Sequence, residues 1–395
     1  MSGAAEITAG EKRRAYTGPA FLSHGFRPFF FLGACFAALA IPLWLAAFTH
    51  GYGVGGDPMR WHVHEMLFGY LAAIIAGFLM TAIPNWTGRL PVMGLPLFLF
   101  VFTWIAGRIA MASGDGILVA TADSAFLLLL AGFAWREVLN GRNWRNLPIC
   151  FFVSLFALGN ILFHLESHLA LPFGIGQRTG LAIAAMLMSL IGGRIIPSFT
   201  INWMKKQDRH PLPSPFGSFD KVVLLATGFV MIGWVAAPDR SGTGYALLAV
   251  GILHLVRLAR WRGWSTFAEP LVAILHIAYA WLMAAFLAIG ASILRPDIVS
   301  PTLALHVLTA GAIGQLTMAV MTRATLGHCG RPLEAGTGTV TIYALIFLGA
   351  ATRIAGPFAM SDYALVMTIS GTLWISGFLL FAILYGPMLF TPRRS

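Results

Sequence analysis

Residues 26–48 read FRPFFFLGACFAALAIPLWLAAF, an apolar run that follows the charged segment Glu11-Lys12-Arg13-Arg14. A helix crosses the hydrocarbon core of a bilayer with about 20 mainly apolar residues, so this run predicts a transmembrane helix. It is too long for the apolar core of a signal peptide, and no small-residue cleavage site follows a short one. We therefore expect it to be retained as the first helix.

Eleven similar runs follow, separated by short connections that contain Pro, Gly and charged residues. The sequence therefore predicts an all-α integral membrane protein of about twelve transmembrane helices, with no soluble domain between them. The twelve predicted runs are 26–48, 63–84, 92–112, 117–137, 147–165, 178–198, 219–237, 243–259, 269–293, 301–322, 338–355 and 362–388.

The composition agrees with a chain that faces lipid. Hydrophobic residues make up 58% of the sequence and charged residues only 10%, whereas soluble domains carry about 25% charged residues. The net charge of +11 is interpreted as charge that anchors the protein at the membrane, so the expected partner is the bilayer and not nucleic acid. Three cysteines, an odd number with no close pair, do not form a disulfide framework.

The positive charges favour one orientation in the membrane. With the N-terminus inside, eighteen of the 26 Lys and Arg residues fall on inner segments, and two, Arg27 and Arg194, lie in helices near their inner ends. Since inner loops carry an excess of Lys and Arg, we expect a bacterial inner-membrane protein with both termini in the cytoplasm. We expect a cytoplasmic segment at 1–25, a single polytopic domain at 26–390 and a cytoplasmic tail at 391–395. The six outer residues are Arg60, Arg108, Arg178, Arg240, Arg295 and Arg353.

Similar residues recur where every fourth predicted helix leaves the membrane. The second helix leaves as MTAIPNWTGR (80–89), the sixth as RIIPSFT (194–200) and the tenth through residues 318–325. Two interpretations stay open: three four-helix quasi-repeats, or chance similarity among apolar helices.

Eleven histidines stand out in so apolar a chain, because ionisable residues inside a membrane are costly and usually functional. The predicted topology sorts them by depth. The outer histidines are His50, His62, His64, His164, His168 and His306, and the inner ones are His24, His210, His254, His276 and His328.

The motif WHVHEM at residues 61–66 opens the second predicted helix. His62 and His64 lie about 200° apart on a regular helix, so they bind one metal together only if this turn is irregular. His62 lies above a stripe of small residues at 69, 73 and 77, where another helix or a flat cofactor can approach. His64 lies about 3 Å deeper. The alternative is a pair of interfacial histidines beside an anchoring tryptophan.

Further outer candidates lie on the fifth and tenth predicted helices. Asn160, His164 and His168 form one stripe, and the i, i+4 spacing suits two-histidine metal ligation; a polar helix end that meets water is the alternative. His306 lies about 8 Å below the outer surface and is interpreted as a metal ligand or a buried hydrogen-bonding residue. His276 is comparably buried but lies toward the inner side.

The inner face carries two motifs with histidine and arginine: SHGFRPFF at 23–30, with Arg27, and RATLGHCGR at 323–331, with Arg323 and His328. They are able to hold a haem propionate or a second metal, and loop chemistry without a cofactor is the alternative. Because no C-x-x-C-H motif occurs, any haem is expected to be non-covalent.

The chain resembles the NnrS family, bacterial membrane proteins of the nitric oxide response. The matching segments run from the first to the tenth predicted helix: FRPFF at 26–30, WHVHEMLFG at 61–69, NWTGR at 85–89, GRIIPSFT at 193–200 and RATLGH at 323–328. The resemblance implies about twelve helices, non-covalent haem of the b type, copper, and protection against nitric oxide.

A more distant likeness is to the catalytic subunits of haem-copper oxidases and nitric oxide reductases. They also have twelve helices, with haem-ligating histidines on the second and tenth, where His62 or His64 and His306 fall. The copper histidines of that superfamily lie on the sixth and seventh helices, and this chain has none there. The likeness is therefore an analogy of topology alone.

The sequence leads to one arrangement of ligands. We expect His306 and either His62 or His64 to coordinate a haem iron: the small-residue stripe favours His62, and greater burial favours His64, which is slightly preferred. His164 is the candidate for copper. Inner alternatives are His276 and His328, with Arg27 or Arg323 at the propionates.

Three functions remain open: a haem and copper protein that binds, detoxifies or reduces nitric oxide, a metal or small-solute permease, and a non-catalytic haem scavenger or sensor. Whether the protein is an enzyme, an oxidoreductase acting on nitric oxide, stays open as well. A proton-coupled reductase needs buried carboxylates, and only Glu65, Asp123 and Glu269 lie near helices. The electron donor is not identified by the sequence.

Overall fold

The computed structural model describes residues 16–51, 53–166, 168–359 and 361–393, so residues 1–15 and 394–395 of the two predicted terminal segments lie outside it. The described residues form helices and connecting turns without a strand. Twelve helices are long and apolar enough to cross a membrane. The predicted fold class, an all-α multi-pass membrane protein, is confirmed.

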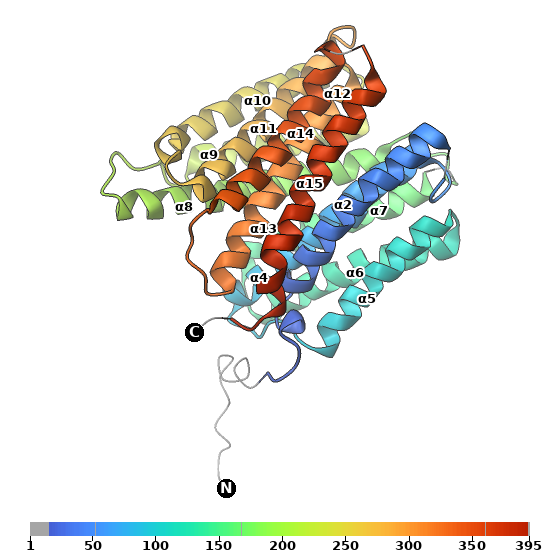
Figure 1. Cartoon of the computed structure of the whole chain (residues 1–395). Coiled ribbons are helices and arrows are strands. Elements are labelled where there is room, and N and C mark those ends of the chain that lie inside the picture. Colours follow the sequence, from blue (N-terminus) through green and yellow to red (C-terminus); the bar gives the residue numbers. More distant parts are fainter. Residues whose placement is uncertain (1–15, 52, 167, 360, 394–395) are drawn as a thin grey trace.

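The helices pack into one tilted bundle (Figure 1). Two of the twelve spans consist of three consecutive helical pieces, and short 3₁₀ turns stand at 20–22, 144–146 and 263–266. The spans are α2 (Phe26–His50), α3–η2–α4 (Pro58–His64, Glu65–Leu71, Ala72–Thr87), α5 (Leu95–Ser113), α6 (Ile117–Asn140), α7 (Leu147–Leu165), α8 (Ile175–Lys206), α9 (Ser218–Ala236), α10 (Ser241–Arg260), α11 (Pro270–Leu294), α12–η5–α13 (Pro301–His306, Val307–Ile313, Gly314–His328), α14 (Thr337–Ala359) and α15 (Tyr363–Phe390).

Several spans begin with a capping residue followed by proline. Asp57 accepts hydrogen bonds from the backbone N–H groups of Met59 and Arg60, and Ser300 accepts one from Leu303. Pro58 and Pro301 follow directly, where the missing N–H of proline leaves no helical hydrogen bond unmade. Because of this cap the second span begins at residue 58, five residues before the predicted run.

The spans differ in how much lipid they meet. In the second and sixth spans, 78% of the most apolar window is buried inside the protein, against 28% for α9. The centre of the bundle is therefore formed by α3–η2–α4 and α8, and residues on these two spans are the best placed to line an interior site.

Both ends of the described chain lie at the same end of the bundle, named here the terminal face (Figure 1). The start of α2 packs beside the end of α15, and Arg27 donates hydrogen bonds to the carbonyls of Met388, Leu389 and Thr391 at 3.1, 2.9 and 2.6 Å. These carbonyls belong to the last turn of a helix, which has no helical donors of its own. Arg27 therefore caps the C-terminal end of α15 and joins it to the start of α2.

A π-helical stretch directly follows a histidine in two spans. Segment η2 begins after His64, and segment η5 begins after His306. Each stretch widens the helix and changes which residues share a face. The sixth span is continuous α-helix, so this recurrence links two of the three predicted quasi-repeat units and not the third.

The orientation in the membrane can be tested with reporter fusions. The loops after Arg142 and Lys206 lie toward the terminal face, and those near Asp57 and Asp239 lie at the opposite face. By the excess of Lys and Arg, fusions after Arg142 and Lys206 are expected to report cytoplasm and those after Asp57 and Asp239 periplasm. Any one fusion on the other side contradicts the assignment.

Candidate cofactor site

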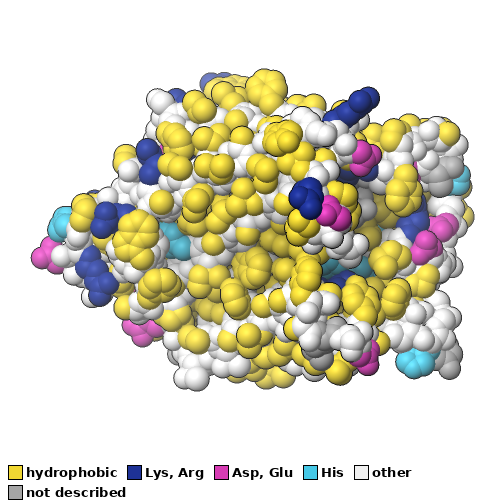
Figure 2. Space-filling model, turned by 90° about the horizontal axis from the view of Figure 1, so that it is seen from above, with side chains coloured by type: hydrophobic (Ala, Val, Ile, Leu, Met, Phe, Trp, Pro, Cys, Tyr) yellow, Lys and Arg dark blue, Asp and Glu magenta, His cyan; other side chains and the backbone are white. Residues whose placement is uncertain are grey.

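A cavity of about 540 Å³ lies in the half of the bundle away from the terminal face, between α2, the second span, α8, the tenth span, α14 and α15. It is named here the histidine cavity, because His62 and His306 both line it. Its size falls within the range of cofactor sites, and its walls are mostly apolar and aromatic. Figure 2, seen from above, shows histidine and basic side chains deep in a hollow on this side.

His62 reaches the cavity from the last turn of α3. Its ring stacks on Trp44 of α2, with centroids 4.3 Å apart and an interplanar angle of 27°. Its Nδ1 atom is buried and has no hydrogen-bond partner among the described residues. This nitrogen is free to contact a bound group, and Nδ1 of His276 is in the same state outside the cavity, so the position of His62 at the cavity wall carries the argument.

His306 reaches the cavity from the last residue of α12. Its Nδ1 lies 2.7 Å from the carbonyl of Thr302, which only accepts, so Nδ1 carries the proton and donates. The lone pair is then on Nε2. Metal-binding histidines are commonly fixed in this way, with one ring nitrogen donating to a carbonyl and the other free to ligate.

Two arginines add positive charge to the cavity wall. Arg60 donates to the carbonyl of Phe163 at 2.5 Å and pairs with Glu166 at 3.1 Å. The guanidinium of Arg353 lies over the ring of Tyr363, 5.3 Å from its centroid. The wall also contains the carboxylates of Asp57 and Glu166, and Glu166 offsets the charge of Arg60. Arg353 is then the cation left to contact an acidic group of a flat, largely apolar ligand.

The small-residue stripe below His62 serves helix packing. The sequence had also allowed a flat cofactor to approach there. A Cβ atom on Gly77 would lie 2.8 Å from the ring of Phe30, and one on Gly69 would lie 2.8 Å from Nη1 of Arg108. The stripe therefore gives α2 and α5 room to approach the second span, and the cofactor interpretation of it is not supported.

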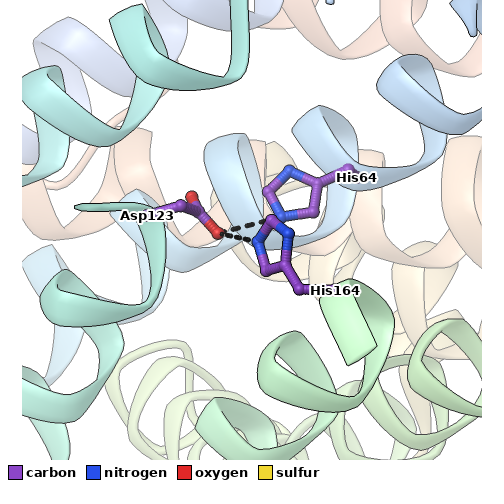
Figure 3. A group of neighbouring side chains, drawn as sticks. All are labelled: His64, Asp123 and His164. Atoms are coloured by element: carbon purple, nitrogen blue, oxygen red, sulfur yellow. Dashed lines mark hydrogen bonds and ion pairs between the residues drawn. The ribbon is translucent and has the colours of Figure 1, made fainter. Parts of the chain in front are cut away.

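His64 does not line the histidine cavity. It belongs to a buried group named here the polar cluster, which is drawn in part in Figure 3. The members come from four spans and are His64, Glu65, Arg108, Asp123, Asn160 and His164.

The centre of the polar cluster is the Oδ2 atom of Asp123. It lies 3.0 Å from Nε2 of His64, 2.9 Å from Nε2 of His164 and 2.8 Å from Nδ2 of Asn160. Arg108 donates to the other oxygen of Asp123 and also to Glu65. Side chains of His64, Glu65 and Asp123 are wholly buried. This is the most polar part of the buried interior near the predicted site.

The sequence predicted His64 and His164 as candidates but not their common partner. Arg108 was assigned to an outer segment, whereas it lies buried within α5. The available signal was an arginine inside the apolar run 92–112 followed by Asp123 inside the next run. The predicted stripe on the fifth span ends at His164, because His168 lies beyond α7 and is exposed.

The inner candidates do not line the histidine cavity. Nε2 of His276 lies 2.8 Å from the hydroxyl of Thr200, and the guanidinium of Arg323 lies over Phe199 at 4.1 Å. His328 and His24 line a separate polar cavity of about 250 Å³ near the terminal face. Arg27 caps α15, and a haem propionate would have to displace that contact.

Fold and site together define a polytopic membrane protein with a histidine-lined cavity inside the bundle. The family model described as NnrS protein matches residues 20–393, nearly the whole chain. The chain belongs to this family, and membership suggests a role in the nitric oxide response. No curated protein matches the sequence.

Proposed function

We propose that the protein binds non-covalent haem in the histidine cavity and uses it to bind nitric oxide, removing the free gas from the membrane. The observation that carries the proposal is that His62 and His306, from two spans far apart in the sequence, line one cavity of about 540 Å³. The nitric oxide part rests on family membership.

The residues of the cavity fit haem. Nε2 of His306 is available because Nδ1 donates to Thr302, and His62 has an unpartnered ring nitrogen. Neutral imidazole is the usual protein ligand of haem iron. The apolar and aromatic walls suit the macrocycle, and Arg353 is the first candidate for holding a propionate. Arg60 would hold the other only by giving up its ion pair with Glu166.

The proposal takes His62 rather than His64 as the partner of His306. The deeper position of His64 was an argument for ligation. In the structure, however, Nδ1 of His64 lies 2.8 Å from Glu65 and its Nε2 lies 3.0 Å from Asp123. A side chain held by two carboxylates is not available to the histidine cavity.

Haem iron, when bound, would supply the atom that binds nitric oxide, which requires one of the two imidazoles, His62 or His306, to leave its position on the iron free. The chain's own residues hold the ring nitrogens at a cavity wall that is mostly apolar and aromatic. A small uncharged gas, which partitions into the membrane, is able to enter such a cavity. The carboxylates of Glu65 and Asp123 are paired with Arg108, so the proposal is for binding or scavenging, with turnover as a separate question.

The optical spectrum of the purified protein tests this function. A Soret band near one haem per chain that survives detergent washing, and that shifts when nitric oxide is added, is the expected result. A deletion strain is expected to be more sensitive to nitric oxide than its parent.

Other results of these measurements would favour a different function. A chain without haem favours the permease, and a haem spectrum unchanged by nitric oxide removes the proposed ligand. Loss of nitric oxide from solution beyond one equivalent, with an artificial electron donor present, would show catalytic reduction and replace the scavenger by an enzyme.

A further inference from the structure

We infer that His64, Asp123 and His164 of the polar cluster form a second site, separate from the histidine cavity, for a divalent first-row transition-metal ion. The inference rests on the geometry of these side chains and stands whether or not haem occupies the cavity. It also gives a location to the copper that the family resemblance implies, for which His164 was the sequence candidate.

The donor atoms are already gathered. One nitrogen from each imidazole and one carboxylate oxygen lie within 4.8 Å of one another, and they come from α3, α6 and α7 (Figure 3). The residues are 0%, 1% and 9% exposed in the order His64, Asp123, His164. Two imidazoles and one carboxylate are a common ligand set for divalent iron and zinc, and sites of nitrogen and oxygen donors also bind Cu²⁺.

The ring of His64 is oriented as in metal-binding histidines. Nδ1 faces Oε1 of Glu65 at 2.8 Å, while Nε2 faces Asp123 and the oxygen of Asn160 at 3.0 and 2.9 Å. A carboxylate that accepts from the far nitrogen of a ligating histidine fixes the tautomer and makes the ligand more basic. Glu65 is therefore a positioning residue for His64.

The charge of the polar cluster favours a cation. Glu65 and Asp123 each carry a negative charge, and Arg108 is the cation that contacts both. His64 faces a carboxylate oxygen with each of its ring nitrogens. Without a metal both nitrogens therefore donate, and the charged imidazole is the second cation that the two carboxylates need in the interior of a membrane protein. A divalent ion bound between Asp123 and Nε2 of His64 would take the place of that proton.

Gly69 allows α5 to lie close to η2, so that Arg108 reaches the carboxylates of the polar cluster. A Cβ atom on Gly69 would lie 2.8 Å from Arg108 and 3.2 Å from Oε2 of Glu65, so a larger residue would push the guanidinium away. Trp104 of α5 donates to the carbonyl of Gly69 at 3.0 Å. Glycine, tryptophan and arginine together hold α5 against η2, and the carboxylates keep their positions.

The polar cluster and the histidine cavity are neighbours. The ring of Phe163 lies 5.1 Å from the ring of His64 and also lines the cavity. The two sites are thus separated by the width of one aromatic side chain. A metal in the polar cluster would lie beside the pocket without sharing a ligand with it.

Binding of Cu²⁺ to tag-free protein, stripped with a chelator in detergent, tests the site. Cu²⁺ is the probe because nitrogen and oxygen sites bind it more tightly than the other divalent first-row ions. We expect about one Cu²⁺ per chain and an electron paramagnetic resonance spectrum with coupling to imidazole nitrogen. His64→Ala and His164→Ala should abolish this signal, and Glu65→Gln should weaken affinity about 10–100-fold.

Two controls separate this site from others. His254→Ala removes a buried, hydrogen-bonded histidine of α10 and should leave copper binding unchanged. His306→Ala should lose haem but keep copper, so failure of the haem proposal is distinguishable. Unchanged copper binding in both cluster variants would overturn the inference. If the variants do not fold, a wild-type spectrum without imidazole coupling overturns it equally.

Discussion

An Arg108→Leu variant is expected to unfold far more easily than the wild type. Arg108 is the guanidinium that contacts both Glu65 and Asp123, and all three side chains are buried. Its removal leaves two buried carboxylates with only His64 between them as a counter-charge. Removing one partner from a buried ion pair typically costs about 3–5 kcal/mol. Thermal unfolding in detergent, followed by a thiol-reactive dye or by circular dichroism, measures the effect.

The triple variant Arg108→Leu, Glu65→Gln, Asp123→Asn is the matched control. Replacing every charge of a buried network by neutral groups is often nearly neutral for stability, whereas leaving an unpaired charge is not. We therefore expect the triple variant to recover most of the loss. A single variant with the wild-type melting temperature would show that the contacts of Arg108 contribute little to the fold.

The second large effect is expected at His306. The variant His306→Ala removes the imidazole that the Thr302 carbonyl fixes at the wall of the histidine cavity. Haem per protein should fall about tenfold or more, equivalent to at least about 1.4 kcal/mol of binding free energy. His62→Ala should lower haem content or change the axial ligation seen in the spectrum. Haem and protein are quantified on the same sample.

His276→Ala is the matched control, since His276 is a buried histidine on a neighbouring span whose Nε2 contacts Thr200. It should keep full haem with an unchanged spectrum. The same is expected for His328→Ala and for His64→Ala as far as haem is concerned. If His306→Ala keeps its haem while His276→Ala loses it, the cofactor lies toward the terminal face and the placement proposed above is wrong.

The sequence predicts the helical architecture because the thickness of a bilayer sets the length of each apolar run. That part needs no knowledge of which helices touch. The ends of the spans are harder to predict: the cap of Asp57 and Pro58 extends the second span outward, and α8 continues to Lys206, well past the predicted run. Polar helix turns outside the hydrocarbon leave no signal in hydropathy.

The site could be predicted only as a set of candidates. Depth selected His306 and one of His62 and His64, with His64 as the deeper of the two, whereas the structure brings His306 and His62 to one cavity. The sequence could not predict that His62 lines the cavity while His64 joins the polar cluster, because most members of that cluster lie on α5, α6 and α7. Asp123 is 41 residues from His164 and 15 from Arg108 in the sequence. Apart from an arginine and an aspartate inside consecutive apolar runs, nothing in the sequence marks them as neighbours.

For Arg27 the sequence suggested a cofactor contact, and the structure shows a structural role instead. An arginine beside a histidine near the inner surface suggests an anion ligand such as a propionate. In the structure it donates to three carbonyls at the end of α15, a role that depends on the two ends of the chain meeting. Sequence patterns do not report such contacts, since the partners are backbone atoms of any residue type.

The π-helical stretches after His64 and His306 have an evolutionary consequence. A stretch of this kind arises when one residue is inserted into an α-helix, and the insertion turns the part on its N-terminal side by about 100° relative to the rest. In both spans that part is the short piece carrying the histidines, α3 or α12, while α4 and α13 keep their packing. Insertion or deletion of a single codon can therefore change which ligand faces the pocket without redesigning the bundle.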